Sequence, residues 1–324
     1  MTTIADIEAA ATRLAGVAVL TPLLQSAALD DLLGGRVLLK AECLQRTGSF
    51  KIRGAYNLLQ QLSPEQARRG AVAWSSGNHA QGVAAAGTML GIHTAIVMPA
   101  DAPRSKLENT RRLGGEVITY DHYSGDREAI ARDLAAERGA ELVPSYEHAG
   151  IISGQGTVGL EIAAQSAALG CPADQVVIPC GGGGLTAGSA VALKARLPEV
   201  QVYTAEPEHY DDTLQSLRSG KRVSVPTNVP SLCDALLTGS PGQLTFDIMR
   251  TLVSGGLVVT EDDVRSAMRF AFRELKIVVE PGGAVALAAL LAGKIDARDR
   301  TTVVVLSGGN VDAELFASIQ LVLV

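Results

Sequence analysis

The chain has 324 residues, of which 47% are hydrophobic, 19% charged and only 4% aromatic, and its net charge is -6. Such a chain is a globular, core-rich protein of two lobes or one large α/β domain, and its negative charge argues against nucleic acid or an anionic membrane as the main partner. Four scattered cysteines without a Cys-x-x-Cys pair exclude a zinc or disulfide framework. The sequence shows no signal peptide and no apolar run near the ~18 residues that span a bilayer. Together these features predict a cytoplasmic protein.

Along the chain, β-like apolar runs alternate with helical patterns. Strands are predicted at residues 37–40, 70–74, 94–98, 116–120, 176–179, 201–205 and 302–306. Helices are predicted at residues 3–15, 54–61, 79–90, 105–113, 125–138, 157–168, 261–274 and 283–292. This alternation predicts an α/β fold with mostly parallel, buried sheets, in which ligands lie at the carboxyl ends of the strands.

The first candidate for chemistry is Lys51, which opens a helix within the segment Ser-Phe-Lys-Ile-Arg-Gly at residues 49–54. Beside Phe50 and at a helix N-terminus, its ammonium form is disfavoured by desolvation and by the helix dipole. A lysine of that kind suits Schiff-base chemistry. The alternative is an ordinary solvated lysine at the start of a helix.

A polar turn follows the predicted strand at residues 70–74. It contains Ser75, Ser76, Asn78 and His79, which offer hydroxyls, an amide and free N–H groups at a helix start. That set fits a carboxylate ligand. The alternative is an N-cap with turn residues.

A glycine-rich turn follows the predicted strand at residues 176–179 and consists of Gly181, Gly182, Gly183 and Gly184. Four consecutive glycines let bare backbone N–H groups gather round a group such as a phosphate at a helix N-terminus. A nucleotide-binding P-loop would continue with Lys and Ser or Thr, but a Leu and a Thr follow here. The turn therefore predicts a phosphate held without a loop lysine.

A third polar turn, at residues 307–310, follows the last predicted strand and begins with Ser307. Three such turns and a lysine supply a phosphate cradle, a carboxylate cradle and an amine. In this combination the chain resembles the fold type II pyridoxal-phosphate enzymes, specifically the serine/threonine dehydratase and serine racemase family with its 3-hydroxyaspartate dehydratase-like subgroup. The resemblance covers nearly the whole chain, and its matching blocks lie at residues 49–54, 75–81, 179–188, 280–284 and 306–310.

The resemblance implies a tryptophan synthase β-like fold of two interleaved domains, each with a mostly parallel sheet flanked by helices. The large cofactor-binding domain would comprise residues 1–69 and 148–324, and the small domain residues 70–147. It also implies a homodimer that acts on a small amino acid.

The resemblance further implies pyridoxal 5′-phosphate as the cofactor. Lys51 would form the internal aldimine and move protons at the substrate Cα, Phe50 would pack on the cofactor ring, and Asn78 would hydrogen-bond the ring hydroxyl. The glycines at 181–184 would hold the phosphate, and Ser307 would face the pyridine nitrogen. A hydroxyl partner leaves the pyridine largely neutral, which favours expulsion of a β-leaving group.

The implied activity is that of an ammonia-lyase, or dehydratase. Water would be eliminated from L-serine, L-threonine or 3-hydroxyaspartate to give a 2-oxo acid and ammonia. Ser75, Asn78 and His79 would bind the substrate α-carboxylate with the help of backbone groups. Ser76 would move a proton on the face of Cα opposite Lys51, which makes serine racemisation the alternative activity; otherwise Ser76 only caps a helix.

The resemblance implies two further sites. Arg127 would clasp the second carboxylate of a dicarboxylic substrate, unless it is an exposed helix arginine beside Asp126. Glu206, Asp212 and the carbonyl of Tyr210 match the cation site of the racemase group, which takes Mg²⁺ or, alternatively, Ca²⁺ or Mn²⁺. The alternative for this segment is an acidic surface turn.

Two rival classes use part of the same residues. A dinucleotide-binding oxidoreductase would explain Gly182, Gly184 and Glu206, which lies about 20 residues further on, but it leaves Lys51 and Ser307 without a role. A non-catalytic pyridoxal-phosphate carrier would lack the substrate-binding groups of the turn at 75–79, which are present. Residues 235–246 do not track the racemases, so the contacts to the substrate side chain stay unassigned.

Overall fold

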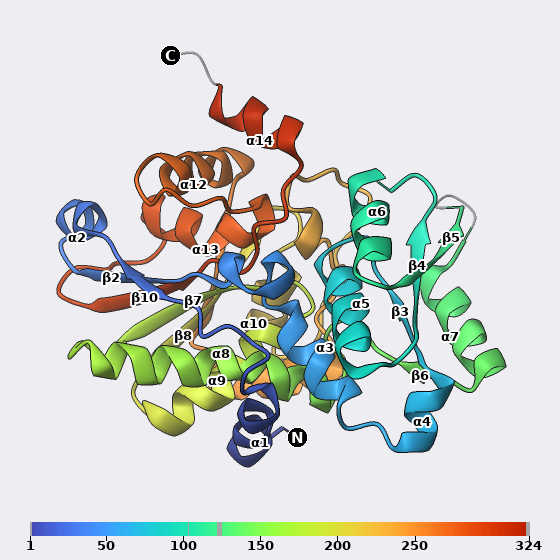
Figure 1. The fold of residues 1–324 in the computed structure, drawn as a ribbon. Coiled ribbons are helices and arrows are strands. Elements are labelled where there is room, and N and C mark those ends of the chain that lie inside the picture. Colours follow the sequence, from blue (N-terminus) through green and yellow to red (C-terminus); the bar gives the residue numbers. More distant parts are fainter. Residues whose placement is uncertain (1, 103, 122–124, 322–324) are drawn as a thin grey trace.

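Two sheets organise the fold of the computed structural model, which describes residues 2–102, 104–121 and 125–321 (Figure 1). The larger has six strands in the order β1-β2-β10-β7-β8-β9, and the smaller has four in the order β5-β4-β3-β6. Neighbouring strands pair in parallel throughout, except that β1 is antiparallel to β2. The predicted fold class, α/β with mostly parallel sheets, is confirmed.

The strands of the six-stranded sheet are β1 (Leu23–Gln25), β2 (Arg36–Lys40), β7 (Gln175–Pro179), β8 (Gln201–Pro207), β9 (Gly255–Val259) and β10 (Thr301–Val305). Those of the four-stranded sheet are β3 (Ala71–Trp74), β4 (Thr94–Pro99), β5 (Glu116–Tyr120) and β6 (Glu141–Leu142). The α-helices are α1 (Ile4–Leu14), α2 (Ala27–Leu33), α3 (Lys51–Leu59), α4 (Pro64–Arg69), α5 (Asn78–Leu90), α6 (Arg104–Arg112), α7 (Arg127–Arg138), α8 (Ala149–Ala168), α9 (Gly184–Arg196), α10 (Asp212–Ser219), α11 (Gln243–Leu252), α12 (Glu261–Arg273), α13 (Pro281–Leu291) and α14 (Ala313–Gln320). Short 3-10 turns are η1 (Glu42–Leu44), η2 (Arg46–Gly48) and η3 (Asp234–Leu236).

The six-stranded sheet is covered on both faces, because successive side chains of each strand point to opposite sides. In β2, Val37 and Leu39 belong to a core shared with α12 and α13, whereas Leu38 belongs to a core shared with α8 and α9. The helices α8 and α9 contact each other closely and run side by side below the sheet in Figure 1. Burial on both sides explains why these strands read as continuous apolar runs.

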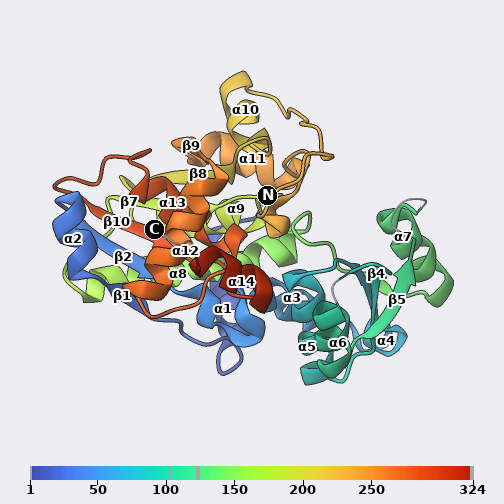
Figure 2. The ribbon, with the colours of Figure 1, turned by 90° about the horizontal axis from the view of Figure 1, so that it is seen from above.

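The four-stranded sheet takes its strands from residues 71–142 and is also packed on both faces. Ala73 and Ile96 lie in a core with α3 and α5, while Val72 and Val97 pack against Ala131 of α7. Figure 2 shows this sheet and α5, α6 and α7 as a group to one side of the six-stranded sheet, with α3 between them. The domain boundaries at residues 70 and 147 stay a prediction.

All seven predicted strands are present, with ends that differ by at most two residues from the prediction. The strands β1, β6 and β9 were not predicted; β1 has three residues, β6 has two, and β9 begins with two glycines. Among the described residues, no helix has both the length and the apolar character needed to cross a membrane.

Candidate functional site

The three polar turns of the sequence all lie at carboxyl ends of strands, after β3, β7 and β10. The segment before α3 is hydrogen-bonded to the turn after β10: the Phe50 N–H donates to the Ser307 carbonyl at 3.2 Å, and the Gly309 N–H donates to the Gly48 carbonyl at 2.9 Å. Since β10 and β7 are neighbours in the sheet, Lys51, Ser307 and the glycine-rich turn are brought together. This edge is where ligands bind in parallel α/β sheets.

Lys51 is the first residue of α3 and is partly buried. Its Nζ donates a hydrogen bond to the Ser145 carbonyl at 3.2 Å and lies 5.3 Å from the centroid of the Phe50 ring. Burial lowers the pKa of the ammonium to about 8, against the opposing attraction of the Glu280 carboxyl. Near physiological pH a larger fraction of this amine is therefore neutral than for an ordinary lysine, and a nucleophile or a general base must be neutral to react.

The glycine-rich turn leads from β7 into α9, with Gly183 as an N-cap that has no side chain and a φ of 91°. Within the described part of the chain, the N–H groups of Gly182, Gly183 and Gly184 donate to no acceptor. Uncapped N–H groups at a helix start attract an anion, and the helix dipole adds to the attraction. The turn can thus hold a phosphate without a cationic side chain.

Tyr146, which no sequence pattern singled out, packs directly on this turn. A Cβ on Gly182 would lie 2.2 Å from Tyr146 ring atoms, and a Cβ on Gly184 would lie 3.0 Å from the Tyr146 Cβ. Since Tyr146 follows Ser145, whose carbonyl holds the Lys51 amine, the same segment joins the amine to the glycine-rich turn. Position 182 therefore requires glycine because Tyr146 packs so closely, in addition to any need to bind a phosphate.

The turn after β3 presents its hydroxyls without using them to cap α5. The N-cap is Gly77, which has no side-chain cap, so the alternative that Ser76 is a helix cap is wrong. The Ser75 Oγ accepts a hydrogen bond from the Gly77 N–H at 3.2 Å. The Ser76 hydroxyl is half-buried and has no hydrogen-bond partner within the described residues.

His79 is buried, and its ring is engaged by the backbone of the segment that follows β6. Its Nε2 lies 2.8 Å from the Val143 carbonyl and must therefore carry the hydrogen, while Nδ1 has no partner among the described residues. Burial, and then the charge of Lys51, lower the pKa of the imidazole to about 3, so the ring is neutral. The side chain offers a carboxylate no N–H donor; only the backbone amide of His79 could bind one.

Asn78 is buried between the two sheets. Its Nδ2 donates to the Glu280 carboxyl at 2.6 Å, and its Oδ1 accepts from Asn310 at 2.7 Å. One N–H of the carboxamide remains. It can serve either the predicted ring hydroxyl or the substrate carboxylate, but not both. Glu280 and Asn310 lie in the sequence blocks at 280–284 and 306–310, but nothing in those blocks indicated this contact.

Arg127 is exposed at the first residue of α7, whose N-cap is Asp126. The structure therefore does not bury it among the other predicted site residues. Its positive charge nevertheless reaches Tyr146, whose phenol pKa is raised mainly by burial and is lowered in part by Arg127. Arg127 thus lies within electrostatic range of Tyr146, which packs on the glycine-rich turn.

The predicted cation ligands Glu206 and Asp212 are both fully buried, so the alternative of an acidic surface turn is wrong. Glu206 accepts hydrogen bonds from the N–H groups of Thr213 at 2.8 Å and Leu214 at 2.9 Å. Both Asp212 carboxyl oxygens are buried without a partner among the described residues. Burial raises the pKa of Glu206 to about 8, with Asp212 adding to the shift, and burial raises the pKa of Asp212 to about 7.

Two buried carboxyls, of which Asp212 has both oxygens unsatisfied, fit a hard divalent cation, which prefers oxygen ligands. Tyr210, also buried, could contribute its carbonyl as a third ligand. Within the described residues no three His, Cys, Asp or Glu side chains form a metal-binding group. The predicted set, with two carboxylates and one carbonyl, is consistent with that finding.

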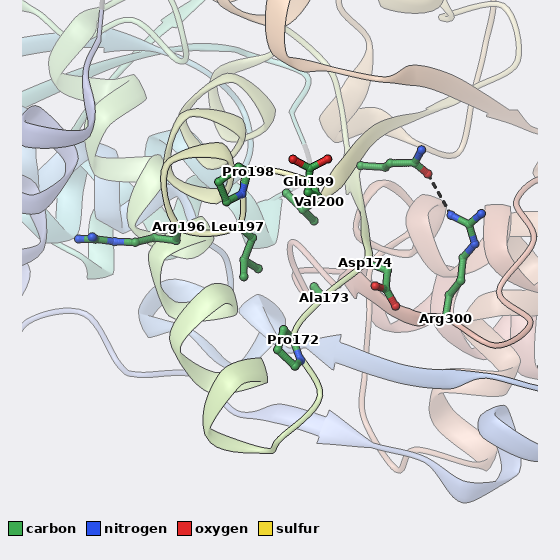
Figure 3. A pocket seen from close by; sticks show the side chains of 10 residues that line it. Pro172, Ala173, Asp174, Arg196, Leu197, Pro198, Glu199, Val200 and Arg300 are labelled. Carbon is green, nitrogen blue, oxygen red and sulfur yellow. Dashed lines mark hydrogen bonds between the residues drawn. The ribbon is translucent and has the colours of Figure 1, made fainter.

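A separate hollow lies at the opposite edge of the six-stranded sheet (Figure 3). It is lined by residues 172–174 before β7, 196–201 before and at the start of β8, and Arg300 before β10. Its cations are engaged: Arg300 donates to Gln201, and Arg196 pairs with Glu8. It lies at the amino ends of the strands and is not part of the candidate site.

Known proteins resemble this chain over nearly its whole length. Residues 16–308 match the family described as pyridoxal-phosphate dependent enzyme. The chain is 41% identical over 314 residues to an L-threo-3-hydroxyaspartate ammonia-lyase of a Pseudomonas species, covering 97% of each chain. It is 37% identical over 312 residues to a serine racemase of Schizosaccharomyces pombe, covering 96% of this chain and 95% of the other.

Among solved structures, the chain is similar to a threonine deaminase from T.th., with a TM-score of 0.91 and 43% identity. The match covers 96% of this chain and 99% of the deaminase. The sequence and structural similarities therefore agree and extend over nearly the whole length.

Proposed function

Because the chain belongs to the family of pyridoxal-phosphate dependent enzymes, we propose that it is an ammonia-lyase that removes water from a β-hydroxy amino acid. The product would be a 2-oxo acid and ammonia, and the substrate one of L-serine, L-threonine or 3-hydroxyaspartate. Of the three relatives named above, the ammonia-lyase and the deaminase remove the amino group of an amino acid, as their names say, and the third is a racemase.

One observation carries this proposal: a desolvated lysine amine lies beside a turn of unbonded N–H groups that ends in a helix dipole. These residues fit pyridoxal phosphate, since Gly182, Gly183 and Gly184 would hold its phosphate and Lys51 would bond its aldehyde. The cofactor, when bound, supplies an electron sink for the bond broken at Cα. Ser307 follows β10 next to Phe50 and would offer the ring nitrogen a neutral hydroxyl partner.

Besides holding the cofactor, Lys51 would act as the base at the substrate Cα. It would remove the Cα proton in either reaction, elimination or racemisation; a proton returned to Cα belongs to racemisation, because the 2-oxo acid formed by elimination carries none at that carbon. The lowered pKa matches this role, since a base must be neutral to accept a proton. The N–H groups at the start of α5 and the hydroxyl of Ser75 would orient the α-carboxylate.

The direct test is a substrate panel with the cofactor-loaded protein. L-serine, L-threonine and L-threo-3-hydroxyaspartate are mixed with it, and ammonia and 2-oxo acid are measured together. We expect equal amounts of both products from at least one of the three. If none reacts while the cofactor is bound, the non-catalytic carrier is the better description.

Serine racemisation is a second candidate activity, supported by the Ser76 hydroxyl that no helix cap occupies. Replacing Ser76 with alanine should remove racemisation of L-serine, since the second face of Cα loses its proton donor, while most of the elimination activity remains. Chiral chromatography of the residual serine and an ammonia assay measure the two reactions in one sample. Racemisation unchanged in the Ser76→Ala variant would exclude this role for the hydroxyl.

We also propose that Glu206, Asp212 and the Tyr210 carbonyl bind Mg²⁺ or Ca²⁺. The carboxyls lose their protons near pH 4 in the unfolded chain but keep them to about 8 and about 7 when folded. Between those values the folded protein binds more protons than the unfolded chain, so its free energy of unfolding decreases as the pH rises. A divalent cation bound by the ionised carboxylates would take the place of the protons and prevent this decrease in the free energy of unfolding.

In the absence of metal, the melting temperature should decrease between ~pH 5 and ~pH 8, and Mg²⁺ or Ca²⁺ should raise it more at the higher pH. The Asp212→Asn variant should show no such rise, because a ligand is lost. Asp262→Asn, an exposed aspartate at 93% exposure, is the matched control and should respond like the unaltered protein. Equal metal response in Asp212→Asn and the control would contradict the site.

Three further expectations stay predictions: recognition of a dicarboxylate by Arg127, a homodimer and a cytoplasmic location.

A further inference from the structure

The carboxamide of Asn78 is held by a continuous set of hydrogen bonds that joins the two sheets. Asn78 begins α5 after the four-stranded sheet, whereas Glu280 is the N-cap of α13 and Asn310 follows β10. Asn78 is 8% exposed and Glu280 is 4% exposed. No local sequence pattern links these residues, since Asn78 and Glu280 are 202 positions apart.

The orientation of Asn310 is fixed by its two acceptors. Its Nδ2 lies 2.7 Å from the Thr47 carbonyl oxygen and 2.7 Å from the Asn78 Oδ1. An amide nitrogen carries two hydrogens, and here each one meets an oxygen. A flipped amide would place its own oxygen against both acceptors, so only one orientation is favourable.

The orientation of Asn78 follows from that of Asn310. Its Oδ1 accepts from Asn310, and its Nδ2 donates to the Glu280 Oε1 at 2.6 Å. Turning the carboxamide over would remove its N–H donation to Glu280 and oppose two NH₂ groups at Asn310. One N–H group is then left over, and it points in a single defined direction.

The backbone around this network is shaped to accommodate it. Thr47, whose carbonyl orients Asn310, has a φ of 62°, an uncommon conformation for a β-branched residue. A Cβ on Gly48 would lie 2.4 Å from the Asn310 Oδ1, and one on Gly308 would lie 2.1 Å from the Glu280 Oε1. Glycine at both positions leaves the space that the network needs.

We propose that Glu280 and Asn310 are positioning residues that hold the Asn78 carboxamide in one orientation and aim its remaining N–H at the ring oxygen of the cofactor. This inference rests on the proposed function, since it assigns Asn78 to that oxygen and not to the substrate carboxylate. Glu280 also lies within electrostatic range of Lys51, which places the network beside the reacting amine.

The proposal predicts how the cofactor's ring oxygen responds when the network is cut. An N–H donor favours the ionised ring oxygen, while a carbonyl turned toward it would favour the protonated form. Asn310→Asp cannot donate to Asn78, and Glu280→Leu cannot accept from it. In both variants the carboxamide loses its fixed orientation.

The experiment compares the visible and near-ultraviolet absorbance of the bound cofactor and the steady-state kinetics of the loaded protein in these two variants. We expect absorbance to move from the visible to the near-ultraviolet band, and kcat to decrease about 10- to 100-fold with a smaller change in KM. Glu280→Gln, which keeps an oxygen acceptor, should recover much of the loss seen in Glu280→Leu. Asn228→Asp, the same change at an exposed loop position, is the control for added charge.

Spectra and kcat within twofold of the unaltered protein in both Asn310→Asp and Glu280→Leu would overturn the inference. A variant that fails to fold is recognised by its melting curve, and the other then decides. If the unaltered protein takes up no cofactor on Lys51 and releases no ammonia, the proposed function itself fails. That outcome is distinct, because it is seen before any variant is made.

Discussion

Replacing Lys51 with alanine should lower ammonia release on the order of 10⁴-fold, because the variant lacks both the covalent anchor and the base at Cα. The buried start of α3 is otherwise unchanged, so the variant should melt near the temperature of the unaltered protein. The glycine-rich turn remains intact, and the variant should still bind the cofactor through its phosphate. Ammonia assays and melting curves, recorded on the same preparation, separate loss of chemistry from loss of fold.

Two controls make the Lys51 result specific. Lys51→Arg keeps the positive charge, but a guanidinium cannot form the covalent bond or act as a base near neutral pH, so it should be as inactive as the alanine variant. Lys221→Ala removes an exposed lysine and should leave the activity unchanged. Activity in Lys51→Arg comparable to the unaltered protein would show that only charge is needed at this position.

The second large effect is expected at Arg53, two residues after Lys51 on α3. Its guanidinium binds the Glu42 carboxylate through Nε and Nη2, both at 2.8 Å, and the Glu161 carboxylate through Nη1 at 2.6 Å. Lys40 also donates to Glu161, at 2.6 Å. Arg53 is 1% exposed, and Glu42 and Lys40 are fully buried, so these charges depend on one another.

Arg53→Ala should lower the free energy of unfolding by about 3–5 kcal/mol, because it leaves a buried carboxylate without its partner. Urea unfolding measures the change. In the double variant Arg53→Met with Glu42→Met, no lone charge remains at that position, and part of the stability should return. Arg104→Ala breaks a pair with Glu108 that is largely exposed and should have no measurable effect. Equal stability of Arg53→Ala and Arg104→Ala would contradict the role of the buried cluster.

The sheets could be predicted from the sequence because their strands are buried on both faces and read as apolar runs. The start of α8, in contrast, was not predicted correctly. A helix was expected from residue 157, but α8 begins at Ala149 and includes Gly150, Gly154 and Gly156. A Cβ on Gly154 would lie 2.6 Å from the Gly54 Cα, and one on Gly156 would lie 2.8 Å from the Gly188 carbonyl oxygen. Close helix packing overrides the low helix propensity of glycine, and a local pattern cannot reveal it.

The candidate site was predictable to the extent that its residues follow strands. Lys51, the four glycines and Ser307 stand beside strand ends or helix starts, which the sequence marks. The tautomer of His79 was not predictable, since it depends on the Val143 carbonyl 64 positions away. Nor was the contact of Tyr146 with Gly182, which the tertiary fold alone creates. Hydrogen bonds between distant segments therefore decide the finer roles in this site.

The central claim is that Lys51 carries the cofactor. The most direct measurement is to incubate the protein with pyridoxal phosphate, reduce it with borohydride, digest it and locate the added mass by mass spectrometry. We predict a yellow protein that is bleached by reduction and carries one cofactor on the peptide containing Lys51. A label on another lysine, or no label with a colourless protein that binds NAD instead, would contradict the account.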